Sequence, residues 1–209
     1  MSSRPNPFVH SAPKEFNGVS HVSGVSDVSD VSPIIDEFSC VYVLERGPES
    51  PDLVNALAPS SGEWPTSSVP HDVRLAVFGL HGGAGTSTVA QLFDGNAFDA
   101  GQGWPLKEDG SEMAAIAVSR THYAGLEAAE SFTQHWGSGS LKGSRLLGLI
   151  LVDDAPRLID SQQRAVKRLL KKTPLGAHVP WVESWRYGPP DPQRLPLRIK
   201  RIVRAFQNA

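Results

Sequence analysis

The sequence predicts an α/β protein, a small three-layer fold with a mostly parallel sheet between helices. Three observations lead to this prediction. From residue 72 onward, short apolar runs of strand length alternate with segments of helical periodicity. A glycine-rich turn joins the first of these strands to the first helix. The length of 209 residues, 40% of them hydrophobic, provides one core and leaves room for tails.

The first 38 residues are predicted to form a disordered, low-complexity tail. From Val19 to Pro33 the chain repeats Val-Ser followed by a variable residue, so each triplet has only one small apolar side chain. Such a segment has no apolar face large enough to offset the entropy lost on folding. The recurring serines leave open a second interpretation, a segment that is phosphorylated or binds a partner.

Residues 39–71 are predicted to contain an edge strand and a linker. Cys40–Leu44 is rich in β-branched and aromatic residues, as short strands are. Gly47–Val69 is rich in proline and serine and is typical of a long connection. The compact domain is therefore expected to span residues 72–209.

The first half of this domain is predicted to contain two strands and two helices. Val73–Gly79 is a nearly continuous apolar run, typical of a strand buried on both faces in a parallel sheet. Ser87–Phe93 follows as a short helix, and Ala114–Val118 as a second buried strand. Tyr123–Trp136 has apolar residues at three- and four-residue spacing, which predicts an amphipathic helix.

The second half continues the alternation. Leu146–Val152 is predicted to be the third strand, Ser161–Lys172 an amphipathic helix and Ala177–Val179 a short fourth strand. Residues 195–207 form a basic amphipathic pattern, which Pro196 can start at its first turn. Ligands of such sheets bind at the C-terminal ends of the strands, so the turns after these strands are where a site is expected.

The turn after the first strand is the most informative segment. Residues 79–90 read Gly-Leu-His-Gly-Gly-Ala-Gly-Thr-Ser-Thr-Val-Ala. Glycines admit unusual backbone angles and close approach, and backbone N–H groups at the start of a helix can point at an anion. The turn therefore predicts a phosphate cradle made of His81, Gly82, Gly83, Ala84, Gly85, Thr86, Ser87 and Thr88.

This turn resembles the deviant P-loop of the ParA/MinD family of ATPases, which reads Lys-Gly-Gly-x-Gly-Lys-Thr followed by Thr or Ser. Gly82, Gly83 and Gly85 match the pattern, and Thr88 matches its last residue. The resemblance implies a P-loop NTPase-like fold, with ATP or ADP as the ligand and Ser87 as a ligand of Mg²⁺. The resemblance would cover about 135 residues, with looser matches at Ile116–Thr121, Leu147–Val152 and His178–Pro180.

The chain departs from the family in two ways. Both loop lysines are missing, because His81 and Thr86 stand in their positions. Only about twenty residues, Gly95 to Ala114, lie where the family has further strands with acidic ends. Phe98–Gly101 resembles a remnant of one such strand end, although the glycines beside it are typical of a loop. Asp153–Asp154 imitates a Walker B acid, but on a later strand.

These departures predict a non-hydrolysing adaptor or binding module, because phosphoryl transfer depends on cations around the transferred group. The protein is thus expected not to be an ATPase. Four alternatives stay open: a purely structural turn, an active ATPase that uses His81 or a partner's lysine, a DNA-binding accessory protein without nucleotide, and a hydrolase. The hydrolase interpretation depends on His81–Ala84, which is similar to the oxyanion loop of esterases, but no separate nucleophile turn follows.

Charge is distributed unevenly along the chain. Residues 1–156 carry 8 basic and 19 acidic side chains, a net charge of −11, and residues 157–209 carry 12 basic and 3 acidic ones, a net charge of +9. This basic end can bind DNA without sequence preference, lie on a membrane surface, contact a protein partner or dock on the acidic half. The residues expected to contact DNA are Arg198, Lys200, Arg201 and Arg204.

The remaining features exclude whole classes of protein. The single cysteine, Cys40, cannot form an intramolecular disulfide and suits a cytoplasmic location. The longest mainly apolar run, Leu146–Val152, is too short to span a membrane. Trp181 and Trp185 either line a base-binding pocket or belong to the core, and Asp153–Asp154 either faces a ligand or caps the following helix.

Overall fold

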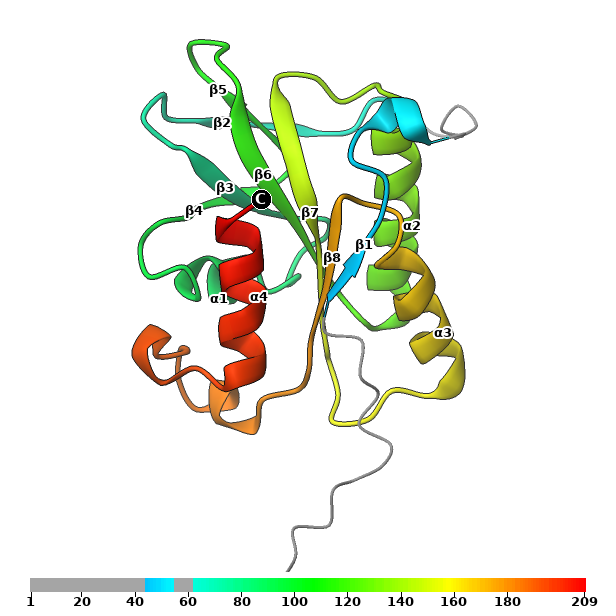
Figure 1. The fold of residues 1–209 in the computed structure, drawn as a ribbon, viewed down its shortest axis with the longest axis vertical. Helices are drawn as coiled ribbons and strands as arrows, with labels where there is room; N and C mark the ends of the chain where they lie inside the picture. Colours follow the sequence, from blue (N-terminus) through cyan, green and yellow to red (C-terminus); the bar gives the residue numbers. More distant parts are fainter. Residues whose placement is uncertain (1–43, 55–61) are drawn as a thin grey trace, which may run out of the picture. The chain divides into compact units, whose positions relative to one another are not determined.

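The computed structural model describes residues 44–54 and 62–209, so the predicted tail of residues 1–38 lies outside the described residues. The chain divides into residues 1–39 and a compact unit, Cys40–Ala209. A six-stranded sheet with the order β1-β8-β7-β6-β3-β4 forms the centre of this unit (Figure 1). Its strands are β1 (Leu44–Arg46), β3 (Leu75–Gly79), β4 (Phe98–Gln102), β6 (Met113–Arg120), β7 (Ser144–Val152) and β8 (Leu175–Val179).

The sheet confirms the predicted mixed α/β class with mostly parallel pairing. The pairs β4–β3, β3–β6, β6–β7 and β7–β8 are all parallel, and only β1 runs antiparallel, beside β8 at the sheet edge. The edge strand begins at Leu44, while the rest of its predicted range, residues 40–43, lies outside the described residues. Because the central strands are parallel, their C-terminal ends and the turns that follow them meet at one edge of the sheet.

Helices cover both faces of the sheet, two on each (Figure 1). They are α1 (Thr86–Gln91), α2 (Tyr123–Gly137), α3 (Asp160–Leu169) and α4 (Leu197–Gln207). Adjacent strand residues point to opposite faces: Val77 packs in the cluster that holds α1 and α4, whereas Phe78 packs in the cluster that holds α2 and α3. The near-continuous apolar runs of β3, β6 and β7 follow from this burial on two sides.

Two predictions between residues 47 and 105 are wrong. A second, two-stranded parallel sheet pairs β2 (Thr66–Val69) with β5 (Trp104–Lys107), where the sequence predicted a linker and a loop. Gly103 has φ 102° and allows the two strands to approach closely, because a Cβ atom at this position would lie 3.0 Å from the backbone carbon of Thr66. The buried indole of Trp104 anchors the strand by donating from Nε1 to the carbonyl of Lys142 at 2.7 Å.

Short 3₁₀ turns complete the described fold: η1 (Pro51–Leu53), η2 (Glu183–Arg186) and η3 (Pro192–Arg194). The last two connect β8 to α4 and carry the chain across the sheet to the α1 side (Figure 1).

Candidate phosphate-binding site

The glycine-rich turn leaves β3 at the C-terminal edge of the sheet and leads into α1. Gly83 and Gly85 have φ of 74° and 95°, in the left-handed region that favours glycine. Gly82 and Gly83 are exposed, whereas Ala84 is 2% exposed and packs in the core. Ala84 therefore anchors the loop in the core. Gly82 and Gly83 have no side chains, so they expose only backbone atoms.

Several backbone donors of this loop have no partner. The N–H of Ala84 donates to the carbonyl of His81 at 3.3 Å, closing the turn. Within the described part of the chain, no acceptor receives the N–H groups of Gly83, Gly85 or Thr86. Unpaired N–H groups on a turn with left-handed residues are the groups that hold anions in proteins.

His81 is engaged inside the chain. Its Nε2 accepts from the backbone N–H of Arg120 at 3.2 Å, and its Nδ1 lies 2.8 Å from the carbonyl of Gly82. The ring also contacts His122 edge-on, with centroids 4.9 Å apart. Only the neutral tautomer with hydrogen on Nδ1 satisfies both bonds. His81 therefore ties the loop to the end of β6 and does not take the place of the lysine as a cation.

Arg120 brings a cation to the loop that the sequence analysis did not single out. It is the last residue of β6, and its Nη1 donates to the backbone carbonyl of Asp153 at 3.1 Å. A Cβ atom on Gly85 would lie 3.6 Å from Nε and 3.7 Å from Nη2 of Arg120. A basic residue at the end of a buried strand was the available signal, since such ends border the ligand edge of a parallel sheet.

Ser87 and Asp99 form a pair beside the loop. The hydroxyl of Ser87 donates to Oδ2 of Asp99 at 2.5 Å, and Oδ1 of Asp99 accepts the N–H of Gly101 at 3.0 Å. The pair forms because β4 is a strand parallel to β3, which aligns Asp99 with Val77. The acid suspected at Phe98–Gly101, Asp99, therefore lies next to Ser87, although it is the second residue of β4 and not at the end of the strand.

The other predicted loop residues contribute to packing. Oγ1 of Thr86 would lie 2.6 Å from a Cβ atom on Gly79, so Thr86 lies over the start of the loop and requires glycine there. Thr88 is partly exposed on the first turn of α1. The described residues contain no group of three or more His, Cys, Asp or Glu that could hold a metal ion by themselves.

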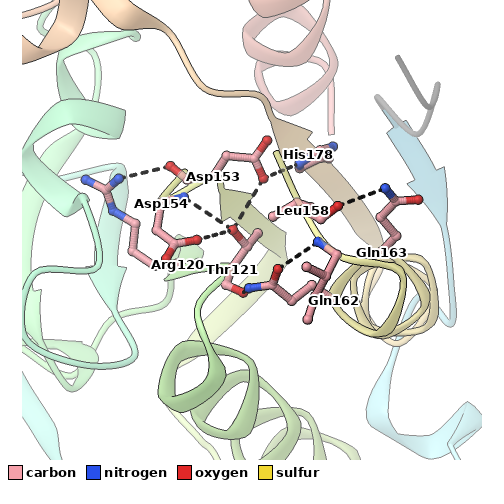
Figure 2. A network of polar contacts seen from close by, with 9 residues as sticks. Arg120, Thr121, Asp153, Asp154, Leu158, Gln162, Gln163 and His178 are labelled. Atoms are coloured by element: carbon pink, nitrogen blue, oxygen red, sulfur yellow. Dashed lines mark hydrogen bonds and ion pairs between the residues drawn. The ribbon is translucent and has the colours of Figure 1, made fainter. Parts of the chain in front are cut away.

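A polar network connects the ends of β6, β7 and β8 (Figure 2). Thr121 Oγ1 lies 2.8 Å from Oδ1 of Asp154 and 3.3 Å from Oδ1 of Asp153, and Nε2 of His178 lies 2.7 Å from the same Asp153 oxygen. Asp153 is only 7% exposed. Both acids are thus bound within the chain, and the N-cap residue of α3 is instead Ile159, whose N–H donates to the Gln162 side chain at 3.0 Å. Of the two interpretations of Asp153–Asp154, the one in which they cap the following helix is therefore wrong.

The two tryptophans after β8 have different surroundings. Trp185 packs against the core cluster on the α1 and α4 side, as the core interpretation predicted. Trp181 donates from Nε1 to Glu183 at 2.8 Å, and the guanidinium of Arg186 lies 6.0 Å from the Trp181 ring centroid. Trp181 is therefore held by its neighbours in η2.

The basic C-terminal part does not form one surface. Helices α3 and α4 lie on opposite faces of the sheet, and Arg168 and Lys172 both pair with Glu130 of α2. On α4, Lys200, Arg201 and Arg204 are exposed. Arg198 is partly buried, its Nε and Nη2 have no partner in the described structure, and burial lowers its pKa although nearby Asp153 raises it. Arg198 is therefore not the solvent-facing cation that the DNA-binding prediction required.

The fold and the loop define a layered α/β protein with a glycine-rich strand-to-helix turn at the ligand edge of its sheet. The sequence model of a family of unknown function, DUF6668, matches residues 73–203, which is more than half of the chain. The protein belongs to this family. Curated proteins and solved structures give no match. In the described ranges, no helix combines the length and apolar character needed to cross a membrane.

Proposed function

We propose that the chain binds the phosphate groups of a nucleotide at residues 82–88 and acts as a non-hydrolysing module of the ParA/MinD-like P-loop type. The observation that carries this proposal is the set of unpaired N–H groups on Gly83, Gly85 and Thr86, which are exposed or partly exposed residues at the C-terminal edge of a parallel sheet. An anion at that position accepts hydrogen bonds from these N–H groups, which otherwise donate to water. A purely structural turn does not require these donors to remain free.

Absence of hydrolysis follows from the chemistry of the loop. Phosphoryl transfer depends on cations that neutralise charge on the transferred group. The loop has Thr86 where the family has its phosphate-binding lysine, and His81 has both ring nitrogens occupied. The site can hold an anion, but it lacks the cation that would stabilise the transition state inside the loop.

The oxygen pair Ser87–Asp99 fits a nucleotide-bound magnesium ion. Mg²⁺ prefers hydroxyl, carboxylate and phosphate oxygens, and this hydroxyl and carboxylate lie 2.5 Å apart beside the loop. Bound there, the ion would offset the negative charge of Asp99 and of the phosphates. Without it, Asp99 repels an incoming phosphate.

Isothermal calorimetry with ATP and ADP, each with and without magnesium, tests the proposal. Saturable heat at sub-millimolar nucleotide is the expected result, together with no phosphate release over hours. If no heat appears at millimolar nucleotide, the loop is only a structural turn. Phosphate release that Ser87→Ala abolishes would instead establish the active ATPase.

Helix α4 supports a second candidate function, DNA binding. Lys200, Arg201 and Arg204 are all exposed on this one helix. We expect a DNA duplex to be retarded by the chain at low salt, with binding lost when these three become alanine and falling steeply as salt rises. Arg164→Ala with Lys171→Ala, on the other face of the sheet, is the control, and it removes two positive charges where the α4 variant removes three. Equal loss in both variants would show that the attraction is not located on α4.

A further inference from the structure

We infer that Arg120 supplies the positive charge for phosphate recognition that the loop lysines supply elsewhere, so that the cation comes from the end of β6 and not from the loop. This inference depends on the proposed function of residues 82–88. It assigns the phosphate-binding cation of this chain and identifies the ligand group as a phosphate oxyanion held by the forked face of a guanidinium.

The position of the guanidinium is the first argument. Nε and Nη2 are the atoms of Arg120 nearest to the open side of Gly85, whereas Nη1 is held by the carbonyl of Asp153. Figure 2 shows the guanidinium of Arg120 bonded to the backbone of Asp153 and lying apart from the Thr121 side chain. One nitrogen thus anchors the group, and the N–H groups on Nε and Nη2 lie beside a loop residue whose own N–H is unpaired.

The absence of an acidic partner is the second argument. No carboxylate in the described ranges lies within ion-pair distance of Arg120. The nearby acids are bound elsewhere: Asp99 to Ser87, Asp153 to His178 and Asp154 to Thr121. A partly buried guanidinium with only one neutral carbonyl on it retains unpaired charge and donors. Its planar fork suits two oxygens of one phosphate, which a lysine contacts only as a point charge.

The way in which the loop is fixed is the third argument. The backbone N–H of Arg120 holds Nε2 of His81, so the residue that supplies the cation also fixes the entry to the loop. Together with the bond from Nη1 to the carbonyl of Asp153, this bond holds the guanidinium near the free N–H groups before a ligand arrives, which lowers the entropic cost of binding.

Calorimetry with ATP and with inorganic pyrophosphate tests the inference on Arg120→Gln and Arg120→Lys. The matched control is Arg145→Gln, because Arg145 is an exposed arginine near the start of β7 that also donates to one carbonyl, that of Ala209. Loss of a charged hydrogen bond weakens binding about ten- to a hundred-fold. We expect that loss for both ligands in Arg120→Gln, a smaller loss in Arg120→Lys and none in the control. Tighter binding of ATP than of pyrophosphate would identify a nucleotide as the source of the phosphate.

The outcomes separate the two proposals. If the parent chain binds neither ligand, the proposed function fails and the inference fails with it. If the parent binds and Arg120→Gln binds equally well, only the inference is overturned. Should the variants not fold, phenylglyoxal labelling of the parent chain gives the answer by mass spectrometry. Protection of Arg120 but not of Arg145 by saturating pyrophosphate is expected, and equal labelling of Arg120 with and without pyrophosphate would overturn the inference.

Discussion

Replacing Thr86 with lysine restores the phosphate-binding residue of the ParA/MinD pattern and so tests whether this loop is a P-loop that has lost a cation. Thr86 is the first residue of α1, is partly exposed, and follows Gly85 directly. Its hydroxyl lies over Gly79, so the substitution removes one small contact and places an ammonium group beside the unpaired loop N–H groups.

The expected gain follows from these surroundings. A hydrogen bond to a charged group contributes about 1.5–3 kcal/mol. The guanidinium of Arg120 already lies near Gly85 and repels a second cation, so the low end applies. A gain of about 1.5 kcal/mol is about a ten-fold lower Kd.

The assay is calorimetric titration of Thr86→Lys with ATP. Gln91→Lys is the control, because it adds the same charge to the exposed end of the same helix. If ATP binds equally more tightly to both variants, the gain is only a general attraction between charges. If Thr86→Lys does not bind ATP more tightly than the parent, the P-loop interpretation is refuted.

Three further predictions concern metal, packing and pH. Asp99→Asn removes a negative charge beside the loop, so it should tighten the binding of metal-free ATP and remove the added affinity that magnesium gives. If calorimetry finds the magnesium effect unchanged, Ser87 and Asp99 do not hold the ion. Gly125→Ala should lower the Tm by several degrees, because its Cβ would lie 2.2 Å from a backbone oxygen and overpacking costs about 1–3 kcal/mol; Gly188→Ala, with open space around it, should not. Burial raises the pKa of Glu130, but the hydrogen bond and charge of Lys172 lower it further, to a net value below the ordinary 4.5. The stability that ionised Glu130 contributes is therefore present at neutral pH and is lost as the pH falls below 4.5 through the lowered native pKa. The free energies of unfolding of the parent and of Glu130→Gln, measured in urea, should converge in acid. A difference that stays constant with pH would contradict this.

Local sequence patterns predicted the central fold well because burial on two sides leaves a strong signal. The runs in β3, β6 and β7 are apolar at nearly every position, and α2 was predicted at Tyr123–Trp136 and observed at Tyr123–Gly137. Strands β2 and β5 left no such signal. Thr66–Val69 is mostly polar, and its partner lies more than thirty residues away at a position fixed by Gly103 and the buried Trp104.

The candidate site could be predicted only in part for a related reason. The glycines mark a turn locally, and the structure has a turn there, between β3 and α1, with Gly83 and Gly85 at positive φ. Arg120 reaches the loop only because β6 pairs with β3 in register, and Asp99 reaches Ser87 only because β4 does so on the other side. Sheet order is a long-range property, and no spacing within the loop encodes it.

Amide-resolved NMR of the isotope-labelled chain during titration with ATP tests the central claim, phosphate binding at residues 82–88, most directly. The largest shifts are expected at the amides of Gly83, Gly85 and Thr86, with the same set moved by inorganic pyrophosphate. Unmoved loop amides at millimolar ligand, or shifts confined to α4, would contradict it.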